Sequence, residues 1–196
     1  SAAGYSARAL ALDVTHTDAV REVFEAQPYD IVVNSAGLAR HSPAVETTED
    51  DFDAVMSINV RAAYFIAQQA AKAMIAHGKG GSIIQISSQM AHVGGVERAV
   101  YCGSKHAIEG MNKAMAIEFG SAGIRVNSIC PTFILTPLTK PTFEDPEKRA
   151  WIDSKIKLPR VGEVEDIMGA AVFLASDASG MITGTSILVD GGWTAG

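Results

Sequence analysis

The feature of this sequence that most constrains its fold is an alternation of short apolar runs with longer segments of helical periodicity. The short runs are rich in Ile and Val and are three to five residues long, too short to be helices. Strands that alternate with helices form a parallel sheet that is covered on both faces. We therefore expect an α/β fold with a doubly wound parallel sheet, in one domain that spans residues 1–196. The expected strands are residues 9–12, 31–33, 82–86, 125–129 and 186–189.

The longer segments between these runs predict helices. We expect Thr17 to cap the first of them, because threonine is a favoured residue at helix starts. Residues 131–146 form a long, proline-punctuated segment, which we expect to cover a ligand site. The expected helices are residues 17–26, 48 or 49 to 76, 99–119 and 163–174.

The composition excludes several classes of protein. With 47% hydrophobic and 19% charged residues, the chain has the balance of a globular domain with a core rather than of a disordered or fibrous chain. A net charge of −6 argues against nucleic acid and membrane surfaces as partners, because phosphates and anionic lipids repel an acidic surface. No apolar run approaches the roughly 18 residues of a membrane span. We therefore expect a small-molecule partner and no membrane association.

The cysteines and the N-terminus indicate a cellular compartment. Cys102 and Cys130 are the two cysteines, and they form no CxxC pair, which favours reduced thiols in a cytoplasmic protein. The first residues lack the basic segment and apolar run of a signal peptide, and we expect the chain to be cut from something longer.

The strongest chemical signal is a tyrosine and a lysine four residues apart. Tyr101 and Lys105 share one face of the expected helix 99–119. A phenol with a pKa of about 10 is a poor acid or base at neutral pH, but an adjacent ammonium stabilises the phenolate. Ser88 follows the apolar run 82–86, where the carboxyl end of a strand meets a ligand crevice, and its hydroxyl is placed to hold a substrate oxygen. Taken alone, a Tyr-x-x-x-Lys pair also occurs by chance in many helices.

Together with Asn34-Ser35-Ala36-Gly37 after a strand and Asn59 in a helix, these residues resemble the short-chain dehydrogenase/reductase family in order and spacing. The resemblance runs from about residue 13 to residue 193 and implies a Rossmann-like sheet. It also implies an enzyme that transfers a hydride between a nicotinamide dinucleotide and an alcohol or carbonyl compound. Either NAD or NADP fits, because the residue that discriminates between them follows the second strand of the family's fold, outside this chain.

The resemblance implies a catalytic role for four residues. Tyr101 resembles the family's general acid and base, and Lys105 its pKa-lowering cation and ribose ligand. Ser88 resembles the residue that orients the substrate, and Asn59 the anchor of a proton relay. The alternative for Asn59 is a buried polar residue that bonds to the backbone.

Further residues are implied to bind the cofactor. Asn34, Ala36 and Gly37 belong to a segment of small residues that lets the backbone approach it closely, and a simple tight turn is the alternative. Asp13 and Val14 resemble an adenine-binding pair, although a turn or helix-capping role is the alternative for Asp13. A third group is placed near the nicotinamide by the resemblance, although Thr132 stands where the family has glycine; this group comprises Pro131, Ile134 and Thr136.

Two kinds of site are not expected in this chain. The five histidines show no metal-ligand spacing, so we expect no metal, and His92 is a candidate for the substrate pocket only. No glycine-rich turn joins a strand to a helix, as pyrophosphate binding requires. We expect the natural protein to carry a further strand-helix-strand unit of about 30 residues or more before Ser1.

Several segments resemble the L-xylulose reductase and polyol dehydrogenase group within the family. They are residues 100–102, 130–132, 160–165 and 179–184. The resemblance implies a sugar alcohol, a ketose or another small carbonyl compound as substrate. A 3-oxoacyl carrier-protein reductase and a catalytically silent dinucleotide-binding regulator are the alternatives.

Members of the family are commonly tetramers, and we expect a homotetramer here. The resemblance implies one interface through helices 51–77 and 99–119 and another through the C-terminal strand. Apolar residues expected to supply this surface are Ile108, Met111, Met115, Phe119 and residues 187–189.

Overall fold

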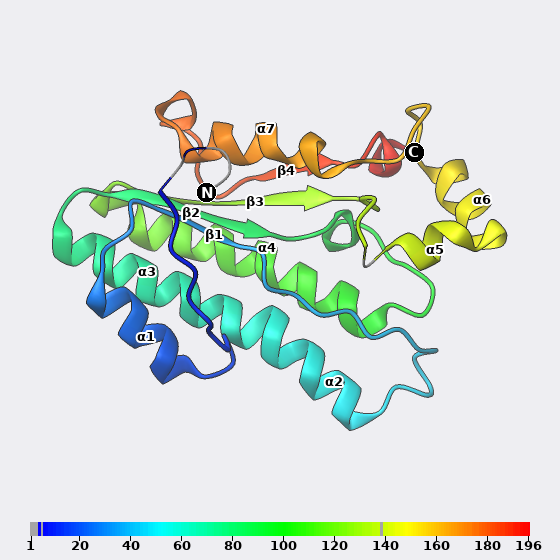
Figure 1. Ribbon diagram of the computed structural model, residues 1–196, viewed down its shortest axis with the longest axis horizontal. Coiled ribbons are helices and arrows are strands. Elements are labelled where there is room, and N and C mark those ends of the chain that lie inside the picture. Colours follow the sequence, from blue (N-terminus) through cyan, green and yellow to red (C-terminus); the bar gives the residue numbers. More distant parts are fainter. Residues whose placement is uncertain (1–3, 5, 138) are drawn as a thin grey trace.

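The computed structural model describes residues 4, 6–137 and 139–196, and it contains a four-stranded parallel sheet in the order β1-β2-β3-β4 (Figure 1). Ile31 of β1 pairs with Ser82 of β2, and Ile83 of β2 pairs with Val126 of β3. The parallel sheet and its helical connections were thus predicted correctly. The strands are β1 (Ile31–Asn34), β2 (Gly81–Ile86), β3 (Ile124–Pro131) and β4 (Ser186–Val189).

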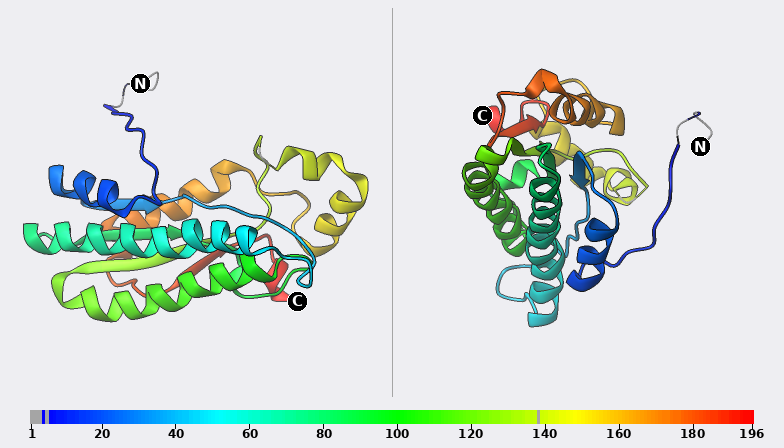
Figure 2. Two further views of the ribbon diagram at one scale, coloured as in Figure 1. Left: turned by 90° about the horizontal axis from the view of Figure 1, so that it is seen from below. Right: turned by 90° about the vertical axis from the view of Figure 1, so that its left-hand side faces the viewer.

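Helices cover both faces of the sheet, as expected. The helices α3 and α4 pack on one face and α7 on the other, while α1 lies against α3 (Figures 1 and 2). The α-helices are α1 (Thr17–Ala26), α2 (Glu49–Met56), α3 (Ala63–His77), α4 (Ala99–Phe119), α5 (Lys140–Glu144), α6 (Pro146–Lys155) and α7 (Val164–Ala175). The remaining helical turns are the π-helix η1 (Ser57–Ala62) and the 3-10 turns η2 (Gln89–Ala91), η3 (Gly120–Ala122), η4 (Asp177–Ser179) and η5 (Trp193–Ala195).

The core lies on both sides of β2 and β3. On the α3 side, Ala67 and Ala71 present small side chains, which let the helix approach Ile83 and Val126 closely. On the α7 side, Ile84 and Ile129 pack against Leu174. These apolar side chains are almost completely buried, as expected for central strands of a parallel sheet that is covered on both faces.

Residues 9–12, expected to form a strand, are extended and exposed but lie outside the sheet (Figure 2). A strand needs a neighbour for its backbone N–H and C=O groups, and none of the four described strands pairs with this segment. At the edge of the sheet, Ile31 and Val33 are 45% and 46% exposed.

The helix boundaries differ from expectation in three places. Thr17 does not cap α1; His16 holds that position and makes no side-chain hydrogen bond. The expected helix after residue 48 begins at Glu49, capped by Thr48, and continues through η1 to His77. The helices α5 and α6 form within and after the segment 131–146, where no helix was expected.

The prediction of which apolar residues lie at the surface is partly wrong. Ile108 and Met115 are buried on α4 and belong to the core, whereas Met111 and Phe119 are half-buried. Within the part of the chain that the structure describes, no helix has the length and apolar character needed to cross a membrane.

Candidate active site

The candidate site lies at the carboxyl ends of β1, β2 and β3, where parallel strands place the loops that bind ligands. Ser88 follows β2 and caps η2, accepting a hydrogen bond from the Met90 N–H at 3.1 Å. Its own hydroxyl donates to Oε1 of Gln89 at 2.9 Å. Ser88 and Tyr101 line a cavity of about 310 Å³. A cavity of this size suits a small substrate.

Tyr101 and Lys105 lie one turn apart on α4, as their spacing predicted. Lys105 is buried, and its Nζ lies 5.7 Å from the centroid of the Tyr101 ring. Burial lowers the pKa of Lys105 to about 8, and the carboxylate of Glu109 opposes this shift. Lys105 is therefore largely protonated at neutral pH.

The pKa of Tyr101 is raised, whereas the four-residue spacing from Lys105 predicted a lowered pKa. Burial raises the pKa of the phenol above its ordinary value of 10, although the neighbouring Ser88 hydroxyl acts in the opposite direction. The ammonium of Lys105 lies over the ring. The Tyr101 phenol is therefore protonated at neutral pH.

Asn59 connects two parts of the site from within the π-helix η1. Its Oδ1 accepts from the Leu38 N–H at 2.7 Å, and its Nδ2 donates to the Leu38 carbonyl at 2.8 Å. The same Nδ2 donates to the Ser104 hydroxyl at 3.0 Å. Single π-helical turns inside α-helices are frequent at functional sites. The two bonds to Leu38 show that Asn59 bonds to the backbone, which was the alternative expected for it.

The loop after β1 approaches this centre. Asn34 ends the strand, donates from Nδ2 to Gln85 Oε1 at 2.8 Å and accepts from the Ala36 N–H at 3.1 Å. A Cβ placed on Gly37 would lie 3.7 Å from Asn59 Oδ1 and 3.8 Å from Lys105 Nζ. Gly37 thus brings the backbone next to two of the four predicted catalytic residues.

The segment after β3 forms another wall of the cavity. Pro131, Ile134 and Thr136 line it, together with Thr139, whose hydroxyl donates to the Ile134 carbonyl at 2.5 Å. The buried hydroxyl of Thr132 has no hydrogen-bond partner among the described residues. A nicotinamide carboxamide would supply a partner for such a group, so the residues present fit this half of a dinucleotide.

Asp13 and Val14, the expected adenine-binding pair, lie in different surroundings. Asp13 is exposed and accepts hydrogen bonds from both the backbone N–H, at 2.9 Å, and the hydroxyl of Thr15, at 2.7 Å, which lower the pKa of its carboxyl. This is the turn role that was the alternative for Asp13. Val14 lines an apolar groove with Asn34 and Ala36 along the β1 edge.

Sequence reasoning missed a polar cluster behind Lys105. Glu109 accepts hydrogen bonds from Ser186 and, at 2.8 Å, from Ser128, and the Cys130 thiol donates to it at 3.4 Å. Burial raises the pKa of the Glu109 carboxyl, but the serine hydroxyls outweigh this and hold it below its ordinary value. The spacing of Lys105 and Glu109, four residues apart on α4, was the available signal.

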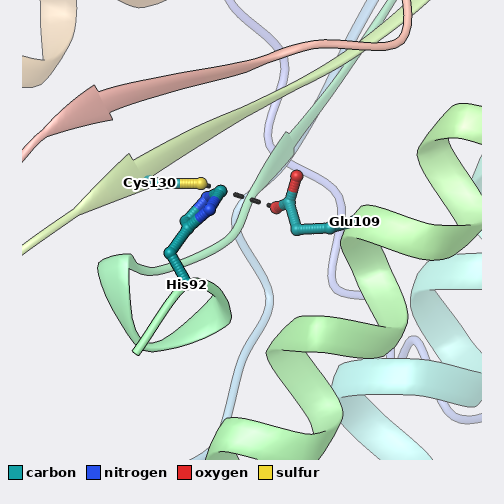
Figure 3. A group of neighbouring side chains, drawn as sticks. All are labelled: His92, Glu109 and Cys130. Carbon is teal, nitrogen blue, oxygen red and sulfur yellow. Dashed lines mark hydrogen bonds between the residues drawn. The ribbon is translucent and has the colours of Figure 1, made fainter. Parts of the chain in front are cut away.

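His92 belongs to this cluster rather than to the substrate cavity. Its ring, Glu109 and Cys130 place one donor atom each within 4.8 Å of one another (Figure 3). Burial and Glu109 raise the pKa of the Cys130 thiol to about 12, so it is not a thiolate at neutral pH. The ammonium of Lys105 nearby opposes a divalent cation.

Two cavity residues had no signal in the sequence. His41 lies edge-on to Tyr101, with ring centroids 6.1 Å apart, and Arg98 immediately precedes α4. Both line the cavity with Ser88 and Tyr101. His41 is on a loop far from these residues in the sequence, and only the fold brings them together.

The fold and this site define a nucleotide-dependent oxidoreductase of the α/β class, and comparison with known proteins identifies the family. A family model described as enoyl-(acyl carrier protein) reductase matches residues 1–194. The chain belongs to the short-chain dehydrogenase/reductase family, whose members use NAD or NADP, and it is an enzyme of the kind that acts on CH–OH groups.

The relatives act on sugars and sugar acids, by their names. The chain is 42% identical over 175 residues to 2-dehydro-3-deoxy-D-gluconate 5-dehydrogenase of Escherichia coli, covering 89% of this chain and 69% of that protein. It is 39% identical over 168 residues to L-xylulose reductase of Bos taurus, with coverage of 86% and 69%. A gluconate 5-dehydrogenase of Burkholderia cenocepacia, solved with NADP and tartrate, superposes with a TM-score of 0.90 at 34% identity, over 94% of this chain and 74% of that chain.

Proposed function

We propose that Ser88, Tyr101 and Lys105 are the catalytic residues of this oxidoreductase and that it interconverts a secondary alcohol and a ketone in a small polyhydroxylated compound. The observation that carries the proposal is the shared cavity of Ser88 and Tyr101, with the Lys105 ammonium over the tyrosine ring. The names of the relatives support sugar alcohols, ketoses and sugar acids as the substrate class.

The proton steps follow from the surroundings of each group. In the direction of reduction, the Tyr101 hydroxyl donates its proton to the carbonyl oxygen of the substrate, and in oxidation it accepts the proton from the alcohol. Its raised pKa keeps it protonated at neutral pH and favours the donor role. The Ser88 hydroxyl bonds to the same substrate oxygen and orients it. The nicotinamide, when bound, supplies or accepts the hydride.

Several residues would hold the cofactor. We propose that Lys105 contacts its ribose, that Pro131, Ile134 and Thr136 contact the nicotinamide, and that the loop 34–37 lies along it. Asn59 is proposed to anchor a proton relay through the loop that it fixes. Asp13 and Val14 are proposed to contact adenine. The glycine-rich pyrophosphate turn stays an expectation about sequence outside this chain.

We also propose a homotetramer in the cytoplasm. Two buried free cysteines support a reducing compartment. Val164, Met168 and Val172 form an exposed stripe at helical spacing on α7, and Leu188 of the edge strand β4 is 43% exposed, which supports an interface on this side. Light scattering that finds only monomers at micromolar concentration would contradict the tetramer.

The reaction is tested with the complete protein and both cofactors. We expect oxidation of a polyol or sugar acid, or reduction of a ketose or dicarbonyl compound, with NAD(H) or NADP(H). Turnover of acetoacetyl thioesters alone would favour the 3-oxoacyl carrier-protein reductase instead. Binding of NAD(P)H without turnover of any of these compounds would favour the catalytically silent regulator.

A further inference from the structure

The cavity of Ser88 and Tyr101 has an uneven distribution of charge. Among the described residues that line it, none is an aspartate or a glutamate, and Arg98 contributes a guanidinium. We propose that Arg98 binds a carboxylate of the substrate, so that the preferred substrate class is a sugar acid rather than a neutral polyol. This inference rests on the proposed function and names the substrate class of the same site.

Arg98 is held in place by aromatic rings. Its Cζ lies 5.7 Å from the centroid of the Phe133 ring and 5.8 Å from that of Trp151. The two rings are nearly perpendicular to each other and stand 6.1 Å apart. Contacts with ring faces restrict a guanidinium without using its N–H groups. The side chain is therefore fixed in position while its donors stay available.

The hydrogen bonds of Arg98 leave donors for a ligand. One Nη donates to the Val96 carbonyl at 2.9 Å, and the described part of the chain offers it no carboxylate within ion-pair distance. A guanidinium has five N–H groups in a planar fork that matches the two oxygens of a carboxylate. A half-buried arginine whose other N–H groups have no partner in the described part of the chain is suited to an anionic ligand.

The other titratable groups around Arg98 do not cancel its charge. Burial and Arg98 itself lower the pKa of His41, so that ring is neutral at physiological pH. Tyr101 is protonated, and Cys102, buried on α4, has a raised pKa and is a neutral thiol. The carboxylate of Glu97 acts against Arg98 by raising the pKa of His41, but Glu97 is exposed and does not line the cavity. The cavity thus presents a net positive charge beside the proton donor.

The test compares substrates that differ only in their terminal group. The complete protein with saturating NADP⁺ or NAD⁺ is assayed with D-gluconate and D-sorbitol, with D-xylonate and xylitol, and with sorbitol 1-phosphate. We expect kcat/KM for each acid to exceed that of its polyol by about tenfold or more, because charge-assisted bidentate hydrogen bonds are stronger than hydrogen bonds to a neutral hydroxyl. The phosphate ester distinguishes a carboxylate site from a general anion site, and a preference for it would overturn the proposal.

Variants assign the preference to Arg98. Arg98→Met keeps packing against the rings, and we expect the ratio of acid to polyol to fall by about tenfold to a hundredfold. Arg98→Lys keeps the charge but loses the fork, so an intermediate ratio is expected. Arg149→Met is the matched control, because Arg149 also lies over an aromatic ring, 5.6 Å from the Phe143 centroid, but outside the cavity. Circular dichroism and melting temperature establish that each variant is folded.

Binding separates this proposal from the proposed reaction. The binding of D-gluconate and of D-gluconamide to the cofactor-loaded protein is measured by calorimetry. Tighter binding of the acid, lost in Arg98→Met, supports the carboxylate site even where no compound is turned over, in which case only the proposed reaction fails. Equal binding of acid and amide, tighter binding of the amide, no binding of either, or a ratio unchanged in Arg98→Met would overturn the proposal.

Discussion

Lys105 donates a hydrogen bond of 2.9 Å from Nζ to the main-chain oxygen of Ile86, the last residue of β2. This bond fixes the buried ammonium at the end of the strand that leads into Ser88. A single neutral carbonyl does not compensate for the hydration that the buried ammonium has lost. The pKa of Lys105 therefore falls to about 8. The site therefore holds a charge that is costly to bury.

Lys105→Met is expected to stabilise the cofactor-free protein and to abolish function. The pKa of Lys105 in the folded chain lies below its ordinary value of 10.5, so the unfolded chain holds this proton more tightly. The cost, on the order of 3 kcal/mol, is present in full below about pH 8 and disappears as the pH rises toward 10.5.

Urea unfolding at about pH 7 and about pH 10 measures this difference. The variant's advantage in free energy of unfolding should shrink at the higher pH, while its turnover and cofactor affinity are low throughout. Lys113→Met, an exposed lysine on the same helix, is the control and should show neither effect. A destabilised Lys105→Met at neutral pH would mean that the ammonium is not buried at a cost.

Glu109→Gln is expected to narrow the pH range of activity. Glu109 is the ionised carboxylate among the groups around Lys105, since Cys130 has a pKa of about 12 and Tyr101 is protonated. Its negative charge favours the ammonium, so removing it lowers the pKa of Lys105 below about 8. The alkaline limb of kcat/KM for reduction should therefore move to lower pH.

The control for Glu109 is an exposed carboxylate on the same helix. Glu118→Gln removes the same charge from the surface of α4 and should leave the limb in place. His92 also faces this cluster, and His92→Gln should be combined with Glu109→Gln to separate their effects. An unshifted limb in Glu109→Gln would show that the cluster is only structural.

Asn59→Ala is expected to destabilise the protein by roughly 2–3 kcal/mol, because it leaves buried and half-buried polar groups without partners. The N–H and carbonyl of Leu38 both lose their hydrogen bonds, and Ser104 loses a donor. Asn112→Ala is the comparison, since Asn112 is also buried but its Nδ2 has no partner in the described structure. Denaturant unfolding that gives equal losses for both variants would contradict the anchoring role.

The sequence predicted the fold best where local pattern and tertiary packing agree. The helix α4 has the predicted bounds because its helical spacing sets Tyr101, Lys105 and Ile108 toward the sheet or the site. Residues 9–12 failed as a strand because strand formation depends on a neighbour that local sequence does not reveal. Asp145-Pro146 was a readable start signal for α6, since Asp145 caps it and proline suits its first turn.

The candidate site was predictable where its residues share one element or follow a strand. Ser88, Tyr101 and Lys105 meet these conditions, and the structure brings them together. Arg98 and His41 were not found, because a single arginine or histidine on a loop has no spacing to mark it. Their roles depend on the cavity that the fold builds around them.

The proton transfer by Tyr101 is the central claim, and turnover of Tyr101→Phe in the complete protein tests it most directly. The substitution removes one hydroxyl and keeps the ring that packs against His41 and Lys105. We predict that the variant folds and binds cofactor with nearly unchanged affinity, while kcat on a proven substrate falls by at least about a hundredfold. Turnover of Tyr101→Phe near the wild-type rate would contradict the proposed mechanism.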